Sequence, residues 1–249
     1  MIIIKTKKEI EIIKENAIDL AKIMKRLKNE VRPGINTLKI ERLAKSLILE
    51  KKAKPSFLGY GGFPSTLCVS INEEIVHGIP SNRILKQGDI LSLDIGMKRN
   101  GYHSDMAVTV PVGNISPEAK RLIKTTKKAL KRGISKIKIK NTIGDIGNCI
   151  QRHIESQGYG VVRDLCGHGI GKGLHEDPQI LNYGKRHSGE KIKKGMVFCI
   201  EPMATSGDWH IKKSKNNFAI ETKDGSMSAH FEHMVVVTEK GSIVLTEID

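Results

Sequence analysis

The sequence predicts an α+β fold built from two related halves, and three observations support this prediction. Residues 91–110 have the pattern of a β-hairpin, amphipathic helices precede and follow it, and the pattern of residues about 1–113 recurs in residues about 114–249. A duplicated unit of two helices and several antiparallel strands accounts for all three observations. We therefore expect one pseudo-twofold domain with a curved antiparallel sheet backed by helices.

The first half begins with two helices. Thr6 and Glu9 have the spacing of a capping box, and a stripe of apolar residues at alternating steps of three and four follows them. That stripe consists of Ile10, Ile13, Ala17, Leu20, Met24 and Leu27. Arg32-Pro33-Gly34 ends the first helix, and Asn36-Thr37 begins the second.

The sheet is predicted from short strands outside the hairpin. A glycine-rich segment, residues 59–64, leads into the first of them. The expected strands are residues 67–71, 74–77, 160–165, 196–202 and 218–237, the last range around an Asp224-Gly225 turn.

The second half again carries two helices. Ser116-Pro117-Glu118 supplies an N-cap, a proline at the first helical position and an acid in the first turn of a basic helix that ends near Gly133. Asn141-Thr142 begins the next helix, as Asn36-Thr37 does in the first half.

The strands repeat as well. Residues 85–94 and 192–201 share the order apolar, Lys, polar, Gly and then a strand that ends in an acid. Residues 105–110 resemble residues 232–237 in the same way, because each run begins with an acid and continues into apolar residues. A duplication would bring the acids of both halves together at the seam.

The hairpin places two carboxylates on one face of the sheet. Asn100-Gly101 between two apolar runs is typical of a type I′ turn, whose two central residues both need positive φ. With these two as the loop, the register sets Asp94 opposite Ala107. Asp105 is two residues from Ala107, so it shares the face of Asp94, roughly 7–8 Å away along the diagonal.

Two bare carboxylates on buried strands repel each other and resist desolvation, so something must neutralise them. One Asp could be protonated, or Lys98 and His103 could be partners. A pair of metal ions is the alternative. The second half supplies Glu201 and Glu232 at the corresponding positions, and four carboxylates around one point favour bound cations.

Two histidines are candidates for completing such a site. His168 lies among glycines, which permit close approach of the backbone, and His175 follows in residues 174–178. Carboxylates with one imidazole and no thiolate suit a divalent transition ion such as Mn, Fe, Co or Zn. Two ions ~3.5–4 Å apart activate water and polarise a carbonyl, so hydrolysis is the expected reaction class.

Other catalytic chemistries lack their motifs. The chain has no G-x-S-x-G elbow and no H-E-x-x-H, and its glycines after Cys166 match neither a dinucleotide-binding fingerprint nor a P-loop. Cys166, two residues before His168, could act as a thiol nucleophile, but neighbours in sequence seldom have triad geometry.

The composition limits the partners and the environment. Lys and Arg outnumber Asp and Glu by 42 to 27, but aromatic residues make up only 4% of the chain. We expect a solvated basic surface, with a weak, salt-sensitive contact to ribosomal RNA at residues 120–140 and 212–215 as the alternative. Four cysteines without CxxC spacing, no long apolar run and no signal-peptide pattern predict a cytoplasmic protein that makes no membrane contact. A monomer is the default expectation.

Six segments resemble the type I methionine aminopeptidases in their short bacterial form, a family with the pita-bread (creatinase/aminopeptidase-like) fold. They are residues 72–80, 94–96, 104–109, 166–171, 200–203 and 231–233, and the resemblance extends over nearly the whole chain. No large insertion separates Glu201 from Glu232, which favours type I over type II. The resemblance implies a single catalytic domain over residues 1–249. It would remove the initiator Met from nascent proteins and peptides when the second residue is small.

The resemblance also assigns roles in the site. The family's metal ligands fall on Asp94, Asp105, His168, Glu201 and Glu232. Two divalent ions (Co, Mn, Fe or Zn) would be bridged by Asp105 and Glu232, and a metal-bound water or hydroxide would attack the carbonyl of the first residue. Glu201 would also move protons. His77 would face the leaving amide nitrogen, and His175 the oxyanion of the tetrahedral intermediate.

A substrate pocket follows from the same resemblance. The methionine side chain needs an apolar, polarisable slot. Its lining falls on Tyr60, Phe63, Cys68, Leu174 and Phe218, together with His77 and His175. Many relatives carry Tyr in place of Phe63 and Trp in place of Phe218, and each difference removes a polar group.

Two alternative functions remain open on the sequence. A related pita-bread hydrolase acts on Xaa-Pro substrates as an aminopeptidase or dipeptidase, but such enzymes usually carry a sizeable extra N-terminal domain. A non-catalytic member of the fold could bind RNA or the ribosome, but loss of metal ligands would mark that case, and all five are present.

Overall fold

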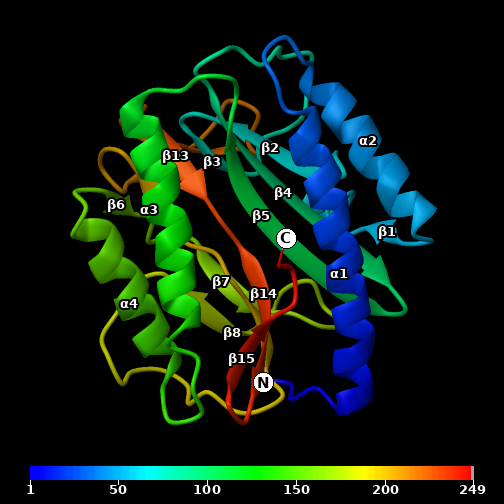
Figure 1. Ribbon diagram of the computed structural model, residues 1–249, viewed down its shortest axis with the longest axis vertical. Helices are drawn as coiled ribbons and strands as arrows, with labels where there is room; N and C mark the ends of the chain where they lie inside the picture. The colour runs from blue at the N-terminus through cyan, green and yellow to red at the C-terminus, as the bar shows by residue number, and fades with distance from the viewer. Residues whose placement is uncertain (248–249) are drawn as a thin grey trace.

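Helices and antiparallel strands alternate in two groups in the computed structural model, which describes residues 1–247. Two helices lie beside each group of strands (Figure 1). The four helices are α1 (Lys7–Glu30), α2 (Thr37–Glu50), α3 (Pro117–Ile134) and α4 (Ile143–Glu155). All four occur where the sequence predicts them.

The helix starts form through the predicted local contacts. The Thr6 hydroxyl oxygen accepts a bond from the Glu9 backbone N–H, and the Glu9 carboxylate accepts one from the Thr6 N–H, which makes a capping box. Asn36 and Ser116 cap α2 and α3 by accepting bonds from backbone N–H groups of the first turn. Each cap satisfies donors that have no partner within the helix.

The central hairpin forms the first sheet and has the predicted register. β4 (Ile90–Arg99) pairs with β5 (Tyr102–Pro111), and Asp94 lies opposite Ala107. Asn100 and Gly101 have φ of 52° and 85°, as a type I′ turn requires. The sheet is completed by β1 (Lys54–Pro55) and β2 (Leu67–Ile71), both paired with β4.

The second large sheet meets the first at β5. Its strands, in spatial order, are β15 (Gly241–Val244), β14 (His233–Thr238), β9 (Val197–Ile200), β7 (Cys166–Gly169) and β8 (Glu176–Leu181). The backbone N–H of Glu232, just before β14, donates to the carbonyl of Ala107 at 2.8 Å. This bridge places the middle of β5 against the start of β14, so the acid-bearing segments of both sheets meet.

Two small sheets depart from the predicted strands. Of residues 160–165 only β6 (Gly160–Val161) is a strand, because the chain then turns so that Asp164 and Leu165 line a cavity. Residues 218–237 form three strands rather than one pair around the predicted turn. They are β12 (Ile220–Thr222), β13 (Ser228–His230) and β14.

The Asp224-Gly225 turn therefore joins two sheets. β12 pairs with β11 (Ile211–Lys213) and β3 (Glu74–Val76), whereas β13 pairs with β10 (Met203–Thr205). The Asp224 carboxylate accepts bonds from the N–H groups of Ser226 and Asp208, so side-chain contacts close this turn instead of a strand ladder. A short 3₁₀ turn, η1 (Tyr60–Gly62), completes the elements.

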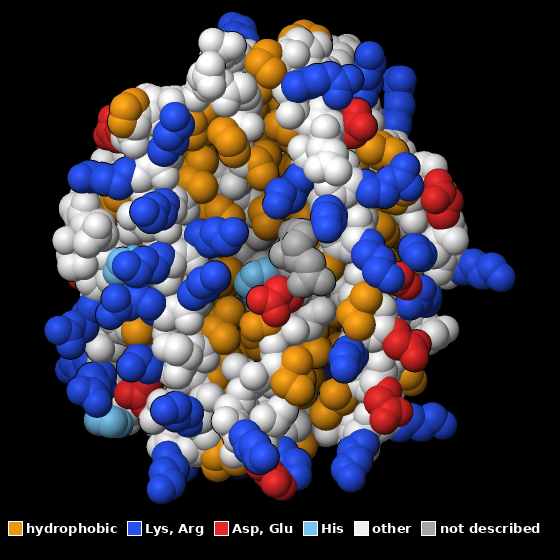
Figure 2. Space-filling model, viewed as in Figure 1, with side chains coloured by type: hydrophobic (Ala, Val, Ile, Leu, Met, Phe, Trp, Pro, Cys, Tyr) orange, Lys and Arg blue, Asp and Glu red, His pale blue; other side chains and the backbone are white. Residues whose placement is uncertain are grey.

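One apolar cluster extends through both helix pairs. Leu20, Ile40, Leu122 and Ile150, one from each helix, are fully buried and belong to it. Outside this core, Lys and Arg side chains cover much of the face seen in Figure 2. No helix within residues 1–247 is long and apolar enough to cross a membrane. The origin of the two halves by duplication stays a prediction.

Candidate metal centre and active site

The five predicted ligand side chains meet where the two large sheets join. β4 carries Asp94, β5 carries Asp105, and β7 carries His168. Glu201 directly follows β9, and Glu232 directly precedes β14. Strand pairing fixes each position, because β4 pairs with β5 and β9 with β14 while the Glu232–Ala107 bridge links the two pairs.

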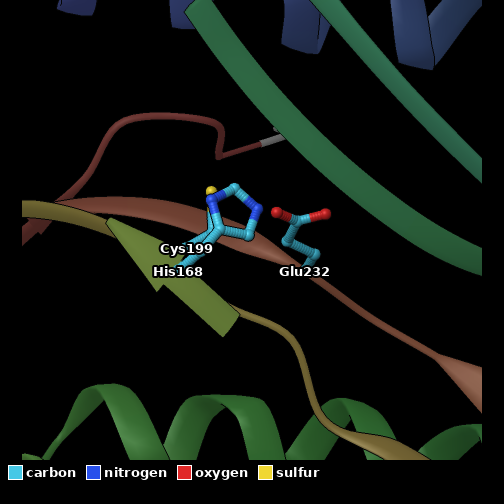
Figure 3. A group of neighbouring side chains, drawn as sticks. All are labelled: His168, Cys199 and Glu232. Carbon is cyan, nitrogen blue, oxygen red and sulfur yellow. The ribbon is translucent and has the colours of Figure 1, made fainter. Parts of the chain in front are cut away.

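Distances between the ligand atoms are those of a metal-binding cluster. Carboxylate oxygens of Asp94, Asp105 and Glu232 all lie within 4.8 Å of one another. Nε2 of His168 lies 3.7 Å from Oε1 of Glu201 and 4.0 Å from Oδ2 of Asp105. Figure 3 shows the ring of His168 and the carboxylate of Glu232 pointing toward each other.

Buried oxygens in this cluster lack hydrogen-bond partners. Oδ1 of Asp94, Oδ1 of Asp105 and Oε1 of Glu232 are buried without one. Asp105 and Glu232 are only 3% and 2% exposed. Unpartnered buried carboxylates are costly unless they are paired or bind a cation, so this set of donors fits divalent ions.

The electrostatics lead to the same conclusion. Burial and the neighbouring Glu232 raise the pKa values of Asp94 and Asp105 well above their usual range, and burial raises that of Glu201 to about 8. Burial and Glu201 likewise raise the pKa of Glu232. Without cations, the cluster would therefore hold protons at neutral pH. Bound cations would reverse these shifts.

Lys98 and His103, the charge partners that the sequence offered for the two aspartates, bond to other groups, so this part of the alternative is wrong. His103 forms a hydrogen bond through Nδ1 with the Ser56 hydroxyl at 2.8 Å, and Nζ of Lys98 donates to the carbonyl of Lys172. Neither side chain bonds to Asp94 or Asp105.

His168 is oriented for ligation. Burial lowers its pKa to about 4, so the ring is neutral. Its Nδ1 lies 3.0 Å from the carbonyl of Gly169, the usual arrangement of a metal-binding imidazole whose other nitrogen faces the ion. Gly169 and Gly167 are required for this approach, because a Cβ at either would lie within 2.3 Å of a backbone oxygen.

A cavity of about 870 Å³ opens above the cluster. Its lining includes every residue that the sequence analysis assigned to the site, from the metal ligands to the pocket residues. Among the described residues, its lining contains seven acidic side chains and no Lys or Arg, although the whole chain has a net charge of +15. Four of these acids are the predicted metal ligands, and Glu176 and Asp177 are paired with Lys5 and with the amino group of Met1.

One wall of the cavity is apolar. The rings of Phe63 and Phe218 contact edge to face at 5.7 Å between centroids. Cys68 and Leu174 are each 3% exposed. Phe63, Phe218, Cys68 and Leu174 together offer an apolar surface to a hydrophobic side chain.

The remaining predicted residues lie at the mouth. The Tyr60 hydroxyl is 2.8 Å from Nδ1 of His175, whose ring contacts that of His168 edge to face. His77 has φ of 59°, which is uncommon outside glycine and is typical of functional sites. Desolvation lowers the pKa of His77 to about 4 and also lowers that of His175, so both rings are neutral at pH 7.

Several neighbours of the site were not predicted. Cys199 approaches His168 and Glu232 within 4.8 Å, and His230 places Nε2 3.6 Å from Oε2 of Glu201. Strand alternation could have indicated His230, because it precedes Glu232 by two residues. Met1 and Ile3 also line the cavity, and no pattern in the sequence indicates this.

Cys166 lines the cavity but is unsuited to act as a nucleophile. Burial and the nearby Glu201 raise the pKa of its thiol. A catalytic thiol needs the opposite shift, because the thiolate is the reactive form.

Comparison with known proteins gives the class of this one. Metallopeptidase family M24 matches residues 11–239. The chain is 45% identical over 248 residues to methionine aminopeptidase 1 of Bacillus subtilis (strain 168), with 100% of both chains covered. The crystal structure of methionine aminopeptidase from Thermotoga maritima matches with a TM-score of 0.97 and 41% identity over 99% of this chain and 100% of that one.

The chain therefore belongs to metallopeptidase family M24, whose pita-bread fold it has. The relatives that it matches over their full length are methionine aminopeptidases. An Xaa-Pro dipeptidase from Bacillus anthracis shares the fold at a TM-score of 0.80 and 24% identity, but this chain covers only 62% of it. The predicted family is confirmed, and the Xaa-Pro alternative is not favoured.

Proposed function

We propose that this protein is a metal-dependent exopeptidase that removes methionine from the amino terminus of peptides and nascent proteins when the second residue is small. The observation that carries the proposal is the cluster of five ligand side chains, with unpartnered buried oxygens, below an acidic and partly apolar cavity. The full-length relatives support the choice of methionine.

The metal site of the proposal uses the five clustered side chains. Two divalent ions (Co, Mn, Fe or Zn) would be held by Asp94, Asp105, His168, Glu201 and Glu232. Such ions act as Lewis acids toward a carbonyl and generate a strong nucleophile from water at neutral pH. The support comes from the donor set: carboxylates and one neutral imidazole.

Substrate binding is assigned to the apolar wall. Phe63, Phe218, Cys68 and Leu174 would bind the methionine side chain, whose thioether makes favourable contacts with aromatic rings. Binding there would place the first peptide bond over the cluster and exclude water from it.

Proton transfer is assigned to three side chains. Glu201 would take a proton from the attacking water and return it to the amide nitrogen that leaves. A neutral His77 would form a hydrogen bond with that nitrogen, and a neutral His175 would donate one to the oxygen that becomes negative. The neutral state of both rings supports these roles, because each can then donate from one ring nitrogen.

Hydrolysis of Met-Ala-Ser tests the proposal. The protein is stripped with a chelator, and Mn, Fe, Co or Zn is added back. We expect metal-restored release of methionine, with Met-Leu-Ser and Ala-Pro-Ser cleaved far more slowly. No metal-restored release from Met-Ala-Ser would overturn the assignment, and preferred cleavage of Ala-Pro-Ser would support the Xaa-Pro alternative.

We also propose that this protein is a cytoplasmic monomer that works close to ribosomes. Its basic surface would make weak contacts with ribosomal RNA. Lys127 and Lys128 on α3 and Lys212 to Lys215 near β11 are exposed apart from Ser214, which supports a contact with phosphates. Ribosome co-sedimentation should weaken with added salt and in K127E/K128E. The matched variant K45E, on α2, should change it little. Co-sedimentation that is unaffected by salt and by K127E/K128E would refute the contact.

A further inference from the structure

A buried ion pair joins the segment before α1 to the loop that carries His175. Nζ of Lys5 lies 2.6 Å from Oε2 of Glu176, and the two side chains are 3% and 10% exposed. Nζ of Lys5 also donates to the carbonyl of Ile3 at 3.2 Å. The backbone N–H of Lys5 donates to the carbonyl of Gly195, which anchors the segment to the strand side of the molecule.

Glu176 uses its other oxygen to close the loop. Oε1 of Glu176 accepts a bond from the N–H of Gly173 at 2.9 Å, and the N–H of Gly171 donates to the carbonyl of Gly173 at 3.0 Å. A Cβ at Gly171 would lie 2.7 Å from Cε of Lys5 and 2.8 Å from Oε1 of Glu176. The loop is therefore packed directly against the ion pair, and only glycine fits at this point without a shift.

Two substrate-facing side chains lie inside this loop. Leu174 belongs to the apolar wall of the cavity, and His175 lies at the mouth with its ring 4.4 Å from that of His168. Both stand between Gly173 and Glu176, the two residues that the Glu176 carboxylate ties together. A displacement of this turn would move both side chains relative to the metal cluster.

A buried ion pair needs an explanation other than stability. Desolvation of two charges costs about as much as their attraction returns, so such a pair adds little net stability compared with apolar side chains. Its directional contacts instead select one arrangement of the groups around it. Here those groups are the amides of a glycine-rich turn, whose glycines have no side chains of their own to hold it.

We propose that Lys5 and Glu176 are positioning residues of the active site: their ion pair holds the turn of residues 171–176 so that Leu174 and His175 face the substrate. The inference rests on the proposed function for the reaction that it affects. It does not concern metal binding, because neither residue is among the five ligands.

The variants K5M, E176Q and K5M/E176Q test this role against K51M, which removes a lysine of another ion pair, with Asp19, outside the cavity. A misplacement of about 1 Å lowers turnover by up to about 10²-fold, so kcat of K5M and E176Q should fall by about 10- to 100-fold. KM should change much less, and metal dissociation constants measured by calorimetry should stay within about twofold, because uniform binding is retained. K5R should keep most of the activity, and K51M should match the wild type.

The double variant separates positioning from stability. Each single variant leaves one buried charge without its partner and should lower the melting temperature, whereas K5M/E176Q carries no buried charge and should recover it. If the pair positions the turn, kcat of the double variant stays low although its stability returns. A kcat that recovers with the melting temperature, or that never falls, overturns the proposal.

Hydrogen exchange gives a readout that does not depend on activity. The amides of Gly171 and Gly173 should exchange at least 10-fold faster in K5M than in the wild type and at an unchanged rate in K51M, because their bonds depend on the turn. If the wild type released no methionine, the proposed function would fail while this measurement still tested the ion pair. Unchanged exchange in K5M would overturn the inference by itself.

Discussion

The floor and the mouth of the cavity are built in different ways. At the floor, the acids lie on strands or directly at their ends and are largely buried, and Asp94, Asp105 and Glu232 each have an oxygen without a partner. At the mouth, Tyr60, His77 and His175 lie on turns and loops and are exposed, and the Tyr60 hydroxyl bonds to Nδ1 of His175. Strand register sets the geometry of the floor, whereas contacts between distant segments set that of the mouth.

Because of this difference, substitutions at the floor and at the mouth should affect the enzyme in different ways. The floor gathers like charges in a buried place, which raises the pKa values of its carboxyl groups and leaves it in need of cations. The mouth carries neutral histidines that need no cation and must only be placed correctly. Substitutions at the floor should therefore change metal binding and chemistry together, and those at the mouth should change turnover alone.

The largest effect is expected at the floor, from D105N. The amide keeps the size of the side chain but removes a negative charge from the proposed metal site. Metal ions contribute several kcal/mol to the transition state, so kcat on Met-Ala-Ser should fall by at least about 10³-fold. Calorimetry should show weaker metal binding. The control is D145N, which removes a buried acid from the start of α4 and should lower stability without changing kcat. Normal metal affinity in D105N would contradict the role of Asp105 as a metal ligand.

At the mouth, H175A should reduce turnover less and leave the metals in place. Removing one donor to a developing oxyanion costs about 10²–10³-fold in kcat, and the partly exposed position of His175 favours the lower end. Metal dissociation constants should stay within about twofold of the wild type. The exposed His187 provides the matched control, and H187A should have normal kcat. A loss of metal binding in H175A would show that the mouth also contributes to metal binding, which would contradict the distinction between floor and mouth.

The acids of the floor should also make the metal-free protein less stable as the pH rises. Burial raises the pKa of Glu201 from 4.5 to about 8, so between these values the folded state holds a proton that the unfolded state has lost. The free energy of unfolding then falls with increasing pH. Histidines with lowered pKa values act in the opposite direction only below about pH 6.5. The melting temperature should therefore drop between pH 6.5 and 8.

Divalent ions, and separately the substitution E201Q, should reduce the fall of the melting temperature with pH. Bound cations replace the protons, so the metal-loaded protein should lose less stability over this range. E201Q cannot ionise at this position and should show a shallower slope without metal than the wild type. A metal-free melting temperature that rises from pH 6.5 to 8 would contradict the arrangement of the floor.

The positions of the floor acids were predictable from sequence because strand register and the alternation of side chains follow simple rules. A type I′ turn at Asn100-Gly101 fixed the register, and a period of two placed Asp94 and Asp105 on one face. The likeness between residues 85–94 and 192–201 then indicated Glu201 as their counterpart. Every step used only local pattern and pairing.

The mouth was only partly predictable. Tyr60, His77 and His175 were assigned by family resemblance, and the structure places all three around the cavity. The ion pair of Lys5 with Glu176 joins residues 171 positions apart, and no local pattern encodes such a contact. The strands expected at 218–237 failed for the same reason, because β12 and β13 pair with different distant partners.

The smallest effect is expected from Y60F, which removes a single bond at the mouth. The Tyr60 hydroxyl lies 2.8 Å from Nδ1 of His175, and Tyr60 is 50% exposed, so water can replace it. A net hydrogen bond is worth about 0.5–1.5 kcal/mol, which predicts a loss in kcat of about 2- to 10-fold. KM and the metal dissociation constants should not change. Because the Lys5–Glu176 pair holds the turn that carries His175, Y60F combined with K5M should lose more than the product of the two single effects. A loss in Y60F alone as large as that in H175A would mean that this exposed bond, rather than the buried ion pair, holds the histidine in place.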